Sequence, residues 1–511
     1  MVGRASCAVG LAFTLLASSC TSATPAQQSS SGKPGPGSSL TRLRLAEAED
    51  AQTLDPALID DPTSLAIGSE LFEGLTRLDA SLRPVPGLAD HWDISDGGMT
   101  YTFRLRSAKY QSGATVHAQD ALTAWTRALT LTLASPLAVF FSPLGVSHPG
   151  DPLTGVEVVD PQTVRVRLPR PDSALLTLLA LPPFWLTDPA QPDSGSGPYH
   201  LERWDRGHTL HLSSNAGYWG RRPSVGTVDI EIEPDAGKRI DRFLSGAIDV
   251  AHGFSGPQLL TFARDPAHTA QLHKVPTGRS TYLGFNAVAG SGYGPPERLA
   301  IAQAIDRSRL TDLALFGSML AAPATDLLPP GVAGHLSRVL PAYDPAGARR
   351  SLDLAGFQGQ INLYFSTNST VGRVGRDLQD QLMTATGRTV NLHPIGDFFR
   401  RASLDELPVF IDTWTADYPY PSDLLENLLR SNAQFNNVAI SDPQLDAALD
   451  QGKGALTFDG ALKAYQQAET IALNENRLIP LYSGIEPYLV RTGITVEFIG
   501  GSVPYRWEDV R

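Results

Sequence analysis

Cysteine is nearly absent from this chain of 511 residues, and both cysteines, Cys7 and Cys20, lie within the first 20 positions. The rest of the sequence therefore has no thiol for a disulfide, a metal ligand or a nucleophile, which excludes redox and cysteine chemistry. Lysine is also scarce, and the net charge of −12 is spread without long runs of one sign. A basic surface for nucleic acid is excluded as well.

Long apolar runs are missing too. The longest N-terminal one, Ala5–Leu16, is shorter than the roughly 20 residues that span a bilayer, and no later segment reaches that length without charges. It follows the positive charge of Arg4 and ends in small residues, which is typical of a signal peptide. We therefore expect residues 1–19 to be a signal peptide and the mature chain to be exported and soluble.

The signal ends in Leu16-Ala17-Ser18-Ser19-Cys20, which resembles the bacterial lipobox, in which the cysteine is diacylated and becomes the first mature residue. Ala17 departs from that pattern, because leucine is usual there. Residues 20–40 are mostly Ser, Gly, Pro and Gln with a single charge at Lys33, too polar to bury a core. We expect Cys20 to carry lipid and 20–40 to tether the body to the outer face of the cell membrane. An ordinary secretory signal with a chance cysteine is the alternative.

The body of about 470 residues is too large for one hydrophobic core and implies two or three domains. Alternation of apolar and polar residues predicts strands at 100–106, 163–168, 209–212 and 228–233. Helical spacing appears at 297–315, at 371–382 before Gly387, and at 445–473 after Asp442, a candidate N-cap. This interleaving of strands and helices predicts a mixed α/β fold.

A series of short motifs runs in one order between about residues 50 and 420. Its members include Leu54-Asp55-Pro56, Glu70-Leu71-Phe72-Glu73-Gly74-Leu75, Gly197-Pro198-Tyr199, Asn215-Ala216-Gly217-Tyr218-Trp219-Gly220, Leu283-Gly284-Phe285-Asn286, Ala304-Ile305-Asp306-Arg307 and Trp414-Thr415-Ala416-Asp417-Tyr418-Pro419. Each motif is weak alone, but the order is specific. In this order the chain resembles the family 5 extracellular solute-binding proteins, the group that contains the dipeptide-, oligopeptide- and nickel-binding proteins of ABC importers.

The resemblance implies an α/β fold of the two-lobed periplasmic-binding-protein type (type II, cluster C), with an extra subdomain and a ligand cleft between the lobes. The first lobe would then combine 41–60, 194–282 and 485–511. Residues 61–193 would form the extra subdomain, and 283–484 the second lobe. Ligand would bind between the lobes and select the closed state that the importer recognises.

Within the resemblance, the W-x-A-D-Y element is the candidate ligand site. In peptide-binding relatives its aspartate, here Asp417, pairs with the ligand's α-ammonium, and the preceding backbone pairs with the peptide like an added strand. A carboxylate in a closed cleft suits that charge-assisted hydrogen bond. The other residues of this predicted site are Thr413, Trp414, Thr415 and Tyr418. A structural aspartate beside core aromatics is the alternative.

A zwitterionic ligand also needs a cationic partner. Arg373 and Arg376 lie early in the helix expected after Ser366-Thr367-Asn368, where relatives tend to place cations near the ligand's carboxylate. A guanidinium fork fits a carboxylate well. Solvated arginines on the helix surface are the alternative.

We thus expect a monomeric, lipid-anchored protein that hands short peptides to an ABC importer permease, needs no cofactor or metal and is not an enzyme. Gly253-Phe254-Ser255-Gly256-Pro257 has proline where a nucleophile elbow needs glycine, and no GxxxxGK element is present. Nickel-chelate, haem or oligosaccharide ligands stay open, because relatives with this fold carry them. A structural or adhesive lipoprotein is a further alternative.

Overall fold

The computed structural model describes residues 40–511, except 131, 134, 287–291, 339, 403–405 and 502–504. The predicted signal peptide, Cys20 and the tether up to Ser39 lie outside the described residues. In the described part of the chain, none of the helices combines the length and the apolar character that crossing a bilayer requires.

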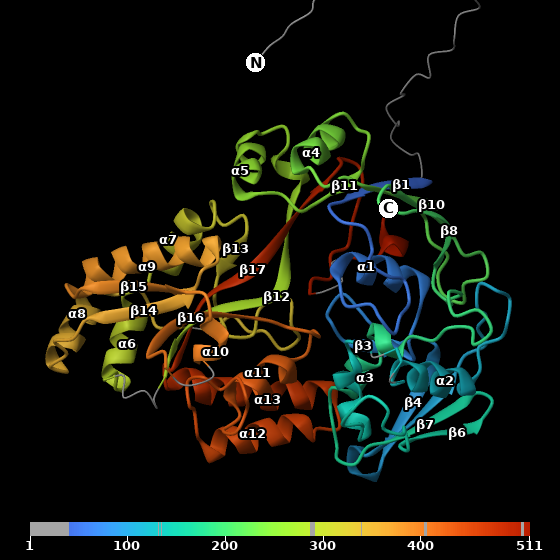
Figure 1. Ribbon diagram of the computed structural model, residues 1–511, viewed down its shortest axis with the longest axis horizontal. Helices are drawn as coiled ribbons and strands as arrows, with labels where there is room; N and C mark the ends of the chain where they lie inside the picture. Colours follow the sequence, from blue (N-terminus) through green and yellow to red (C-terminus); the bar gives the residue numbers. More distant parts are fainter. Residues whose placement is uncertain are drawn as a thin grey trace, which may run out of the picture. The chain divides into compact units, whose positions relative to one another are not determined.

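One large sheet of eleven strands runs through the described residues (Figure 1). Ten of its strands lie side by side, and the eleventh, β13, pairs with β17 outside this row. In spatial order the strands are β15 (Val390–Ile395), β14 (Ile361–Ser366), β16 (Val409–Thr415), β12 (Leu272–Phe285), β17 (Leu478–Val490), β11 (Val250–Ala251), β1 (Arg42–Glu47), β10 (Thr227–Ile232), β9 (Thr209–Ser214) and β8 (Tyr199–Asp205), with β13 at Ala321–Pro323. The predicted strands at 209–212 and 228–233 are confirmed as β9 and β10.

The long strands β12 and β17 join the two halves of this sheet. They pair in antiparallel fashion from Leu272↔Leu489 to Gly284↔Leu478, with register shifts between Pro276 and Ser280 and again after Thr281. On its other side β12 pairs with β16 from Arg279↔Thr415 to Phe285↔Val409. The irregular stretch of β12 therefore lies where β16 ends, and this stretch faces the cavity described below.

A smaller four-stranded sheet has the order β4 (Ala89–Ser95), β5 (Thr100–Leu105), β7 (Thr163–Arg167) and β6 (Val156–Asp160), beside the pair β2 (Thr76–Leu78) and β3 (Pro84–Pro86). β5 and β7 confirm the strands predicted at 100–106 and 163–168. Helix α2 (Ala118–Ala128) covers this sheet, and its fully buried Trp125 packs edge-on against Phe184 and donates from Nε1 to the Phe184 carbonyl. The short α3 spans Leu175–Leu178.

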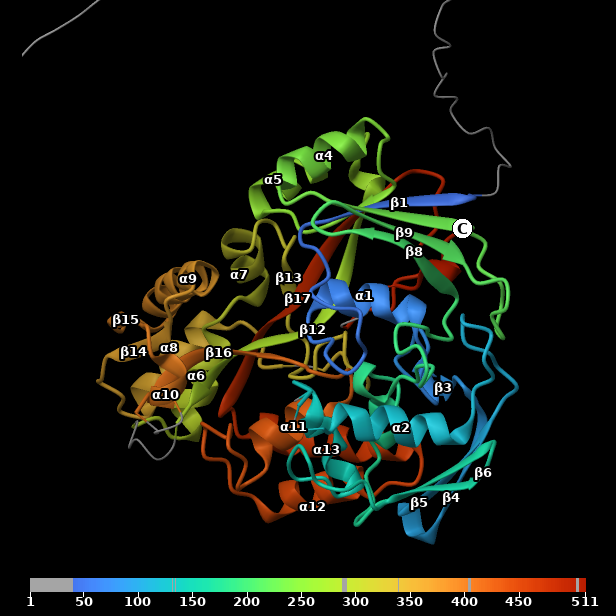
Figure 2. The same ribbon diagram turned by 45° about the vertical axis from the view of Figure 1, so that its right-hand side comes forward.

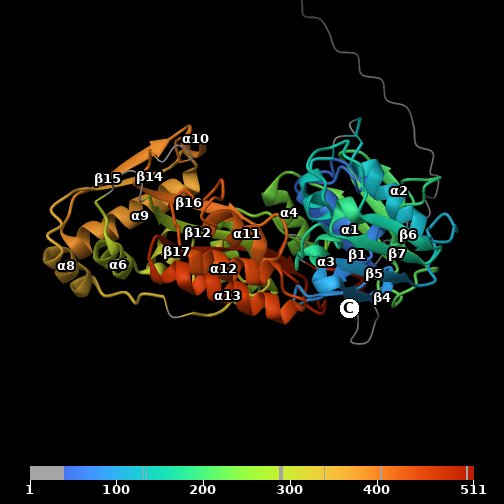
Figure 3. The same ribbon diagram turned by 90° about the horizontal axis from the view of Figure 1, so that it is seen from below.

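The helices that follow β12 are α6 (Pro295–Gln303), α7 (Arg307–Ala314), α8 (Pro345–Leu354), α9 (Ser369–Thr386), α10 (Phe398–Ala402), α11 (Pro421–Leu429), α12 (Pro443–Lys453) and α13 (Phe458–Asn474). Helix α9 packs on β14 and β15, whereas a group of three helices, α11, α12 and α13, lies nearer to β12 and β17, on the side of the smaller sheet (Figure 3). α9 ends at Gly387, whose φ of 69° is the left-handed conformation that glycine adopts at such ends, as predicted.

Two predicted helical runs are each divided in the structure. The run 297–315 is broken before Asp306, which accepts from the Arg309 N–H and so begins α7. The run 445–473 is broken after Lys453, and Thr457 begins α13 by accepting from the Gly460 N–H. Side-chain caps at these points compete with continuation of the helix. Asp442 is confirmed as the N-cap of α12, accepting from the Gln444 N–H at 2.7 Å.

The remaining helices lie in the half of the chain that contains β1. α1 (Pro62–Leu71) starts with Asp61 accepting from the Ser64 N–H, and proline takes the first helical position. α4 (Ala236–Leu244) and α5 (Gly256–Arg264) lie next to each other (Figure 2), with the Phe243 and Phe262 rings 6.0 Å apart. One core there unites Leu43 and Leu45 near the start of the described chain with Trp507 and Val510 near its end.

Candidate functional site

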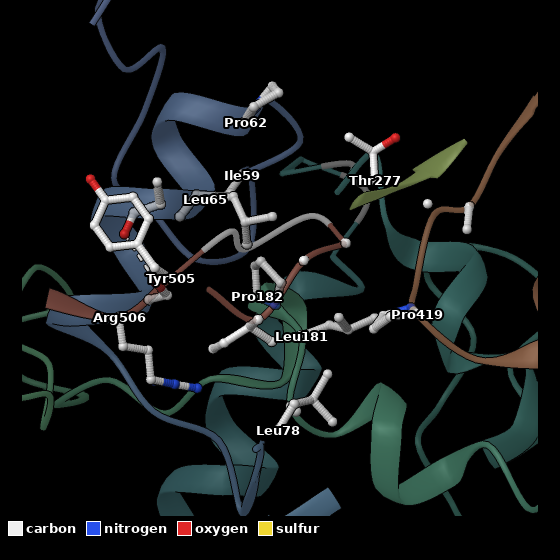
Figure 4. A pocket seen from close by; sticks show the side chains of 18 of the residues that line it. Ile59, Pro62, Leu65, Leu78, Leu181, Pro182, Thr277, Pro419, Tyr505 and Arg506 are labelled. Carbon is white, nitrogen blue, oxygen red and sulfur yellow. Dashed lines mark hydrogen bonds between the residues drawn. The ribbon is translucent and has the colours of Figure 1, made fainter. Parts of the chain in front are cut away.

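A cavity of about 450 Å³ opens where α1, the irregular stretch of β12, the end of β16 and the C-terminal segment meet. Figure 4 shows Pro62 and Leu65 of α1, Thr277 of β12, Pro419 and Arg506 around it. Its walls are largely apolar, with a small set of charged groups among them. An apolar cavity with a few placed charges is the usual form of a small-molecule site.

Asp417 stands at the β16 side of this cavity. It follows the end of β16, and the Ala416 N–H donates to the Gly278 carbonyl at 2.9 Å, which extends the pairing with β12 by one residue. The Asp417 side chain is exposed to the cavity, and among the described residues its carboxylate has no hydrogen bond or ion pair. Desolvation by the surrounding protein raises the pKa of this carboxyl. Within the described ranges, Asp417 is thus a carboxylate without a bonded protein partner.

Asp423, in the first turn of α11, holds the Asp417 segment in place. Its Oδ2 accepts from the Trp414 indole N–H at 2.9 Å and from the Asp417 backbone N–H at 3.2 Å. Burial raises the pKa of Asp423 to about 7 despite these bonds. The sequence showed an acidic residue at this position but gave no sign that it folds back onto the W-x-A-D-Y element.

The structure brings only part of the predicted site to the cavity. Thr415 and Asp417 line it. Trp414 is half-buried and packs edge-on against Phe435, and Tyr418 packs edge-on against Phe140 with its hydroxyl 3.0 Å from Ser422 Oγ. Thr413 Oγ1 lies 2.8 Å from Thr281 Oγ1. These three side chains therefore support the site from behind.

The two predicted arginines lie on α9 instead. Arg373 donates from Nε to the Ala314 carbonyl at 3.1 Å, and its guanidinium lies 4.8 Å from the centre of the Phe316 ring. Neither Arg373 nor Arg376 is among the described residues that line the cavity. A carboxylate-binding role for them stays a prediction.

A partly buried ion triad of Glu47, His252 and Glu486 forms another wall. His252 Nε2 lies 2.7 Å from a Glu47 carboxylate oxygen and Nδ1 lies 3.5 Å from Glu486, while the ring stacks on Tyr488 at 4.8 Å. Burial disfavours the imidazolium, but the two carboxylates outweigh it and raise the pKa of His252 to about 10. The residue is charged at neutral pH, and its partners are already in place.

Two buried carboxyl groups lie under α1. Glu73 accepts from the Tyr218 hydroxyl at 2.7 Å and from the Trp219 indole N–H, and burial raises its pKa to about 7. Glu70 accepts from the Trp507 N–H at 2.8 Å, and burial together with nearby Glu508 raises its pKa to about 8. Sequence reasoning assigned no role to Glu73, although a carboxylate inside Leu71-Phe72-Glu73-Gly74-Leu75 is a usable signal of a buried bond.

A metal site requires several ligating side chains close together in space. Within the described ranges, no three His, Cys, Asp or Glu side chains are grouped so that they could hold a metal ion.

Comparison with known proteins adds the family. The profile of the bacterial extracellular solute-binding proteins, family 5 middle, matches residues 83–436 of this sequence. The chain belongs to this family. The resemblance inferred from the motif order is confirmed, and the chain is a member of a family of extracellular solute-binding proteins.

Family 5 relatives cover most of its length. The glutathione-binding proteins GsiB of Salmonella choleraesuis and of Escherichia coli are each 26% identical to it, over 86% of this chain and 88% of theirs. Among solved structures, the periplasmic murein tripeptide-binding protein MppA in its unliganded open form has a TM-score of 0.85 at 23% identity, over 93% of this chain and 97% of that one. DppA of Helicobacter pylori, in complex with a peptide, has a TM-score of 0.65 at 21% identity, over 92% and 97%. These likenesses confirm the predicted α/β, two-lobed periplasmic-binding-protein-like fold.

Proposed function

We propose that this chain captures short peptides in the cavity beside Asp417 and delivers them to the membrane permease of an ABC importer. Family membership supports solute binding, and two of the structural relatives, MppA and DppA, bind peptides. The observation that carries the proposal is the Asp417 carboxylate, which is exposed in a largely apolar cavity and has no bonded partner among the described residues. A ligand ammonium supplies the missing partner.

The backbone beside Asp417 also suits a peptide. β16 pairs with β12 along one side, whereas in the described residues its ladder with β14 consists of the single pair Tyr364↔Phe410. The stretch Thr413–Thr415 therefore keeps an edge to which an extended peptide adds as a strand. Main-chain hydrogen bonds of this kind do not depend on the side chains of the peptide. The proposed site therefore selects a peptide by its termini and its length and not by its sequence.

The proposal is tested by Asp417→Asn, which keeps the shape of the side chain and removes its charge. Leaving a desolvated ammonium without its partner costs roughly 2–5 kcal/mol for a buried pair, which is on the order of thirtyfold or more in dissociation constant. We expect this loss in calorimetric titrations with a panel of di- to pentapeptides, and none with the same peptides acetylated at the N-terminus, because they already lack the ammonium.

Asp60 offers a matched control, since it lines the same cavity and is also exposed. Asp60→Asn should change peptide affinity by less than about threefold, as is usual for a solvated carboxylate. Equal losses in both variants would show that the cavity responds to its total charge and not to Asp417. If no peptide binds the unmodified protein, a nickel chelate, haem or oligosaccharide becomes the better proposal.

The proposed lobes follow the boundaries given above: 41–60, 194–282 and 485–511 for the first, 283–484 for the second, and 61–193 for the extra subdomain. With these boundaries, each segment set contributes residues to the cavity, for example His252, Asp417 and Glu73. Ligand between the lobes would then favour their closure. Limited proteolysis with and without a bound peptide would test this, because closure should slow cleavage between the lobes.

For localisation we propose an exported monomer anchored through lipid on Cys20. Lipoprotein processing adds several acyl chains, and more than one chain is needed for stable anchoring. Cys20→Ala should then move the protein from the membrane fraction into the medium. A variant that stays membrane-bound through detergent-free washing would contradict the proposal.

A further inference from the structure

Arg279 is a cation of the cavity that has no bonded protein partner among the described residues. It lies in the irregular stretch of β12, is exposed, and lines the cavity together with Thr277 and Asp417. Among the described residues its guanidinium makes no hydrogen bond and no ion pair, in contrast to Arg77 in the same cavity, which donates to Glu508 at 2.9 Å. Exposed arginines ordinarily lie in solvent, but this one stands inside a ligand-sized space.

The backbone fixes where the Arg279 side chain starts. Its Cα is paired with Thr415 of β16, and its N–H donates to Thr277 Oγ1 at 3.3 Å within the bulged stretch. The side chain then runs over Gly484 of β17: a Cβ at position 484 would lie 2.9 Å from Arg279 Cβ and 3.5 Å from its Cδ. Glycine at 484 therefore leaves the room that this side chain occupies.

That course separates the guanidinium from Asp417. β12 lies between β16 and β17 in the sheet, so a side chain that crosses Gly484 leads away from the strand that carries Asp417. The electrostatics of Tyr482 on β17 agree with this course. Burial raises the pKa of the Tyr482 hydroxyl, and the positive charges of Arg279 and Arg373 oppose that rise. Two opposite charges thus stand in one cavity, near each other and not bonded to each other.

We propose that Arg279 is the carboxylate receptor of this cavity and that, with Asp417, it selects short peptides whose two ends are both free. The proposal rests on the peptide-binding function proposed above. Diagonal neighbours on paired strands lie about 7–8 Å apart, and an extended peptide spans about 3.3–3.6 Å per residue. Two or three residues therefore suffice to join the two charges.

A guanidinium is suited to this task, because its planar fork donates two parallel hydrogen bonds to one carboxylate. An ammonium at the same place would supply charge without the fork. Arg279→Lys is thus a graded variant, and Arg279→Gln removes the charge while keeping most of the stem that covers Gly484. Both changes affect an exposed side chain, so folding should be preserved.

The test compares Ala-Ala-Ala with its C-terminal amide by calorimetry. The unmodified protein should bind the free acid about tenfold or more tighter than the amide, as expected for loss of a charge-assisted pair. Arg279→Gln should bind both with equal affinity, and Arg279→Lys should keep part of the preference. Asp417→Asn should weaken both peptides yet keep their ratio, since the ammonium end is read separately.

Arg203→Gln and Arg506→Gln are the controls, one outside the cavity and one inside it. Both should keep the preference for the free acid. The proposal is overturned if Arg279→Gln keeps the preference for the free acid, or if the unmodified protein binds acid and amide equally well. It is also overturned if the preference is lost instead in Arg373→Gln, Arg376→Gln or Arg506→Gln. In those cases peptide binding at Asp417 stands. Failure of trialanine and of the whole peptide panel to bind overturns both proposals.

Discussion

The charged side chains at the two ends of the cavity differ in whether they have bonded protein partners. Beside α1, Glu73, Arg77 and Glu508 are bonded to one another or to aromatic side chains and lie largely out of solvent. At the β16 end, Asp417 and Arg279 are exposed and have no bonded partner among the described residues. Glu73, Arg77 and Glu508 thus have protein partners before any ligand binds, whereas Asp417 and Arg279 have none among the described residues.

Within one cavity, the paired residues thus stabilise the fold, and the unpaired residues are available to bind a ligand. Charges that are already paired contribute to stability, and removing one leaves its partner buried and uncompensated. Charges that are unpaired contribute little to the folded state and are available to a ligand. Substitutions at the α1 end should therefore lower stability, and those at the β16 end should lower affinity.

Arg77→Ala should give the largest effect. It leaves the buried Glu508 carboxylate without its bonded cation, a loss of about 3 kcal/mol in the free energy of unfolding, since Arg77 itself is about a third exposed. Urea unfolding measures this loss. Arg203→Ala is the control, because Arg203 pairs with Asp205 at 3.6 Å on the open surface and its loss should stay within about 0.5 kcal/mol. Similar losses in the two variants would remove the distinction between the two ends.

Asp423→Ala tests the β16 end of the cavity, where we expect an effect on ligand affinity. It frees the Trp414 indole and the Asp417 N–H from a shared acceptor, so we expect peptide affinity to fall about tenfold because the Asp417 carboxylate is no longer held in place. The Trp414 fluorescence should change in the same variant. Ser422→Ala, which removes a bond to Tyr418 only, should have a smaller effect on affinity, and the reverse order would argue against positioning by Asp423.

The pH dependence of stability is the most gradual of the three effects. The folded pKa values of Glu70 and Glu73, about 8 and about 7, lie above the ordinary 4.5. The folded state therefore holds protons that the unfolded state releases, so this contribution is complete below pH 4.5 and is lost as pH rises through 7 to 8. The melting temperature should fall by a few degrees between pH 5 and pH 9. Glu70→Gln should flatten this profile, and an unchanged profile would contradict the buried, protonated carboxyl.

Sequence patterns predicted the fold better than the site. Alternation located β5, β7, β9 and β10, and the motif order gave the family, because both signals are local. The divided helices were missed, since Asp306 and Thr457 end periodic runs through single side-chain bonds that periodicity does not register. Asp417 was reached through its motif, and the structure places it in the cavity. Arg279 and the fold-back of Asp423 carry no sequence pattern, because each depends on strands that meet only in the folded sheet.

The shared core of Leu43 and Trp507 also has a consequence for the order of synthesis. β1 is made early, but its partner β10 follows about 185 positions later, from Arg42↔Thr227, and Trp507 is 464 positions beyond Leu43. At about 5–20 residues per second, a ribosome needs on the order of half a minute to a minute and a half to supply both sides of this core. β1 can pair with β10 once Thr227–Ile232 has been made, but the core beneath it stays incomplete until Trp507 follows, and contacts so distant along the chain form slowly. This core therefore closes only at the end of synthesis, a late closure that is compatible with the export proposed above.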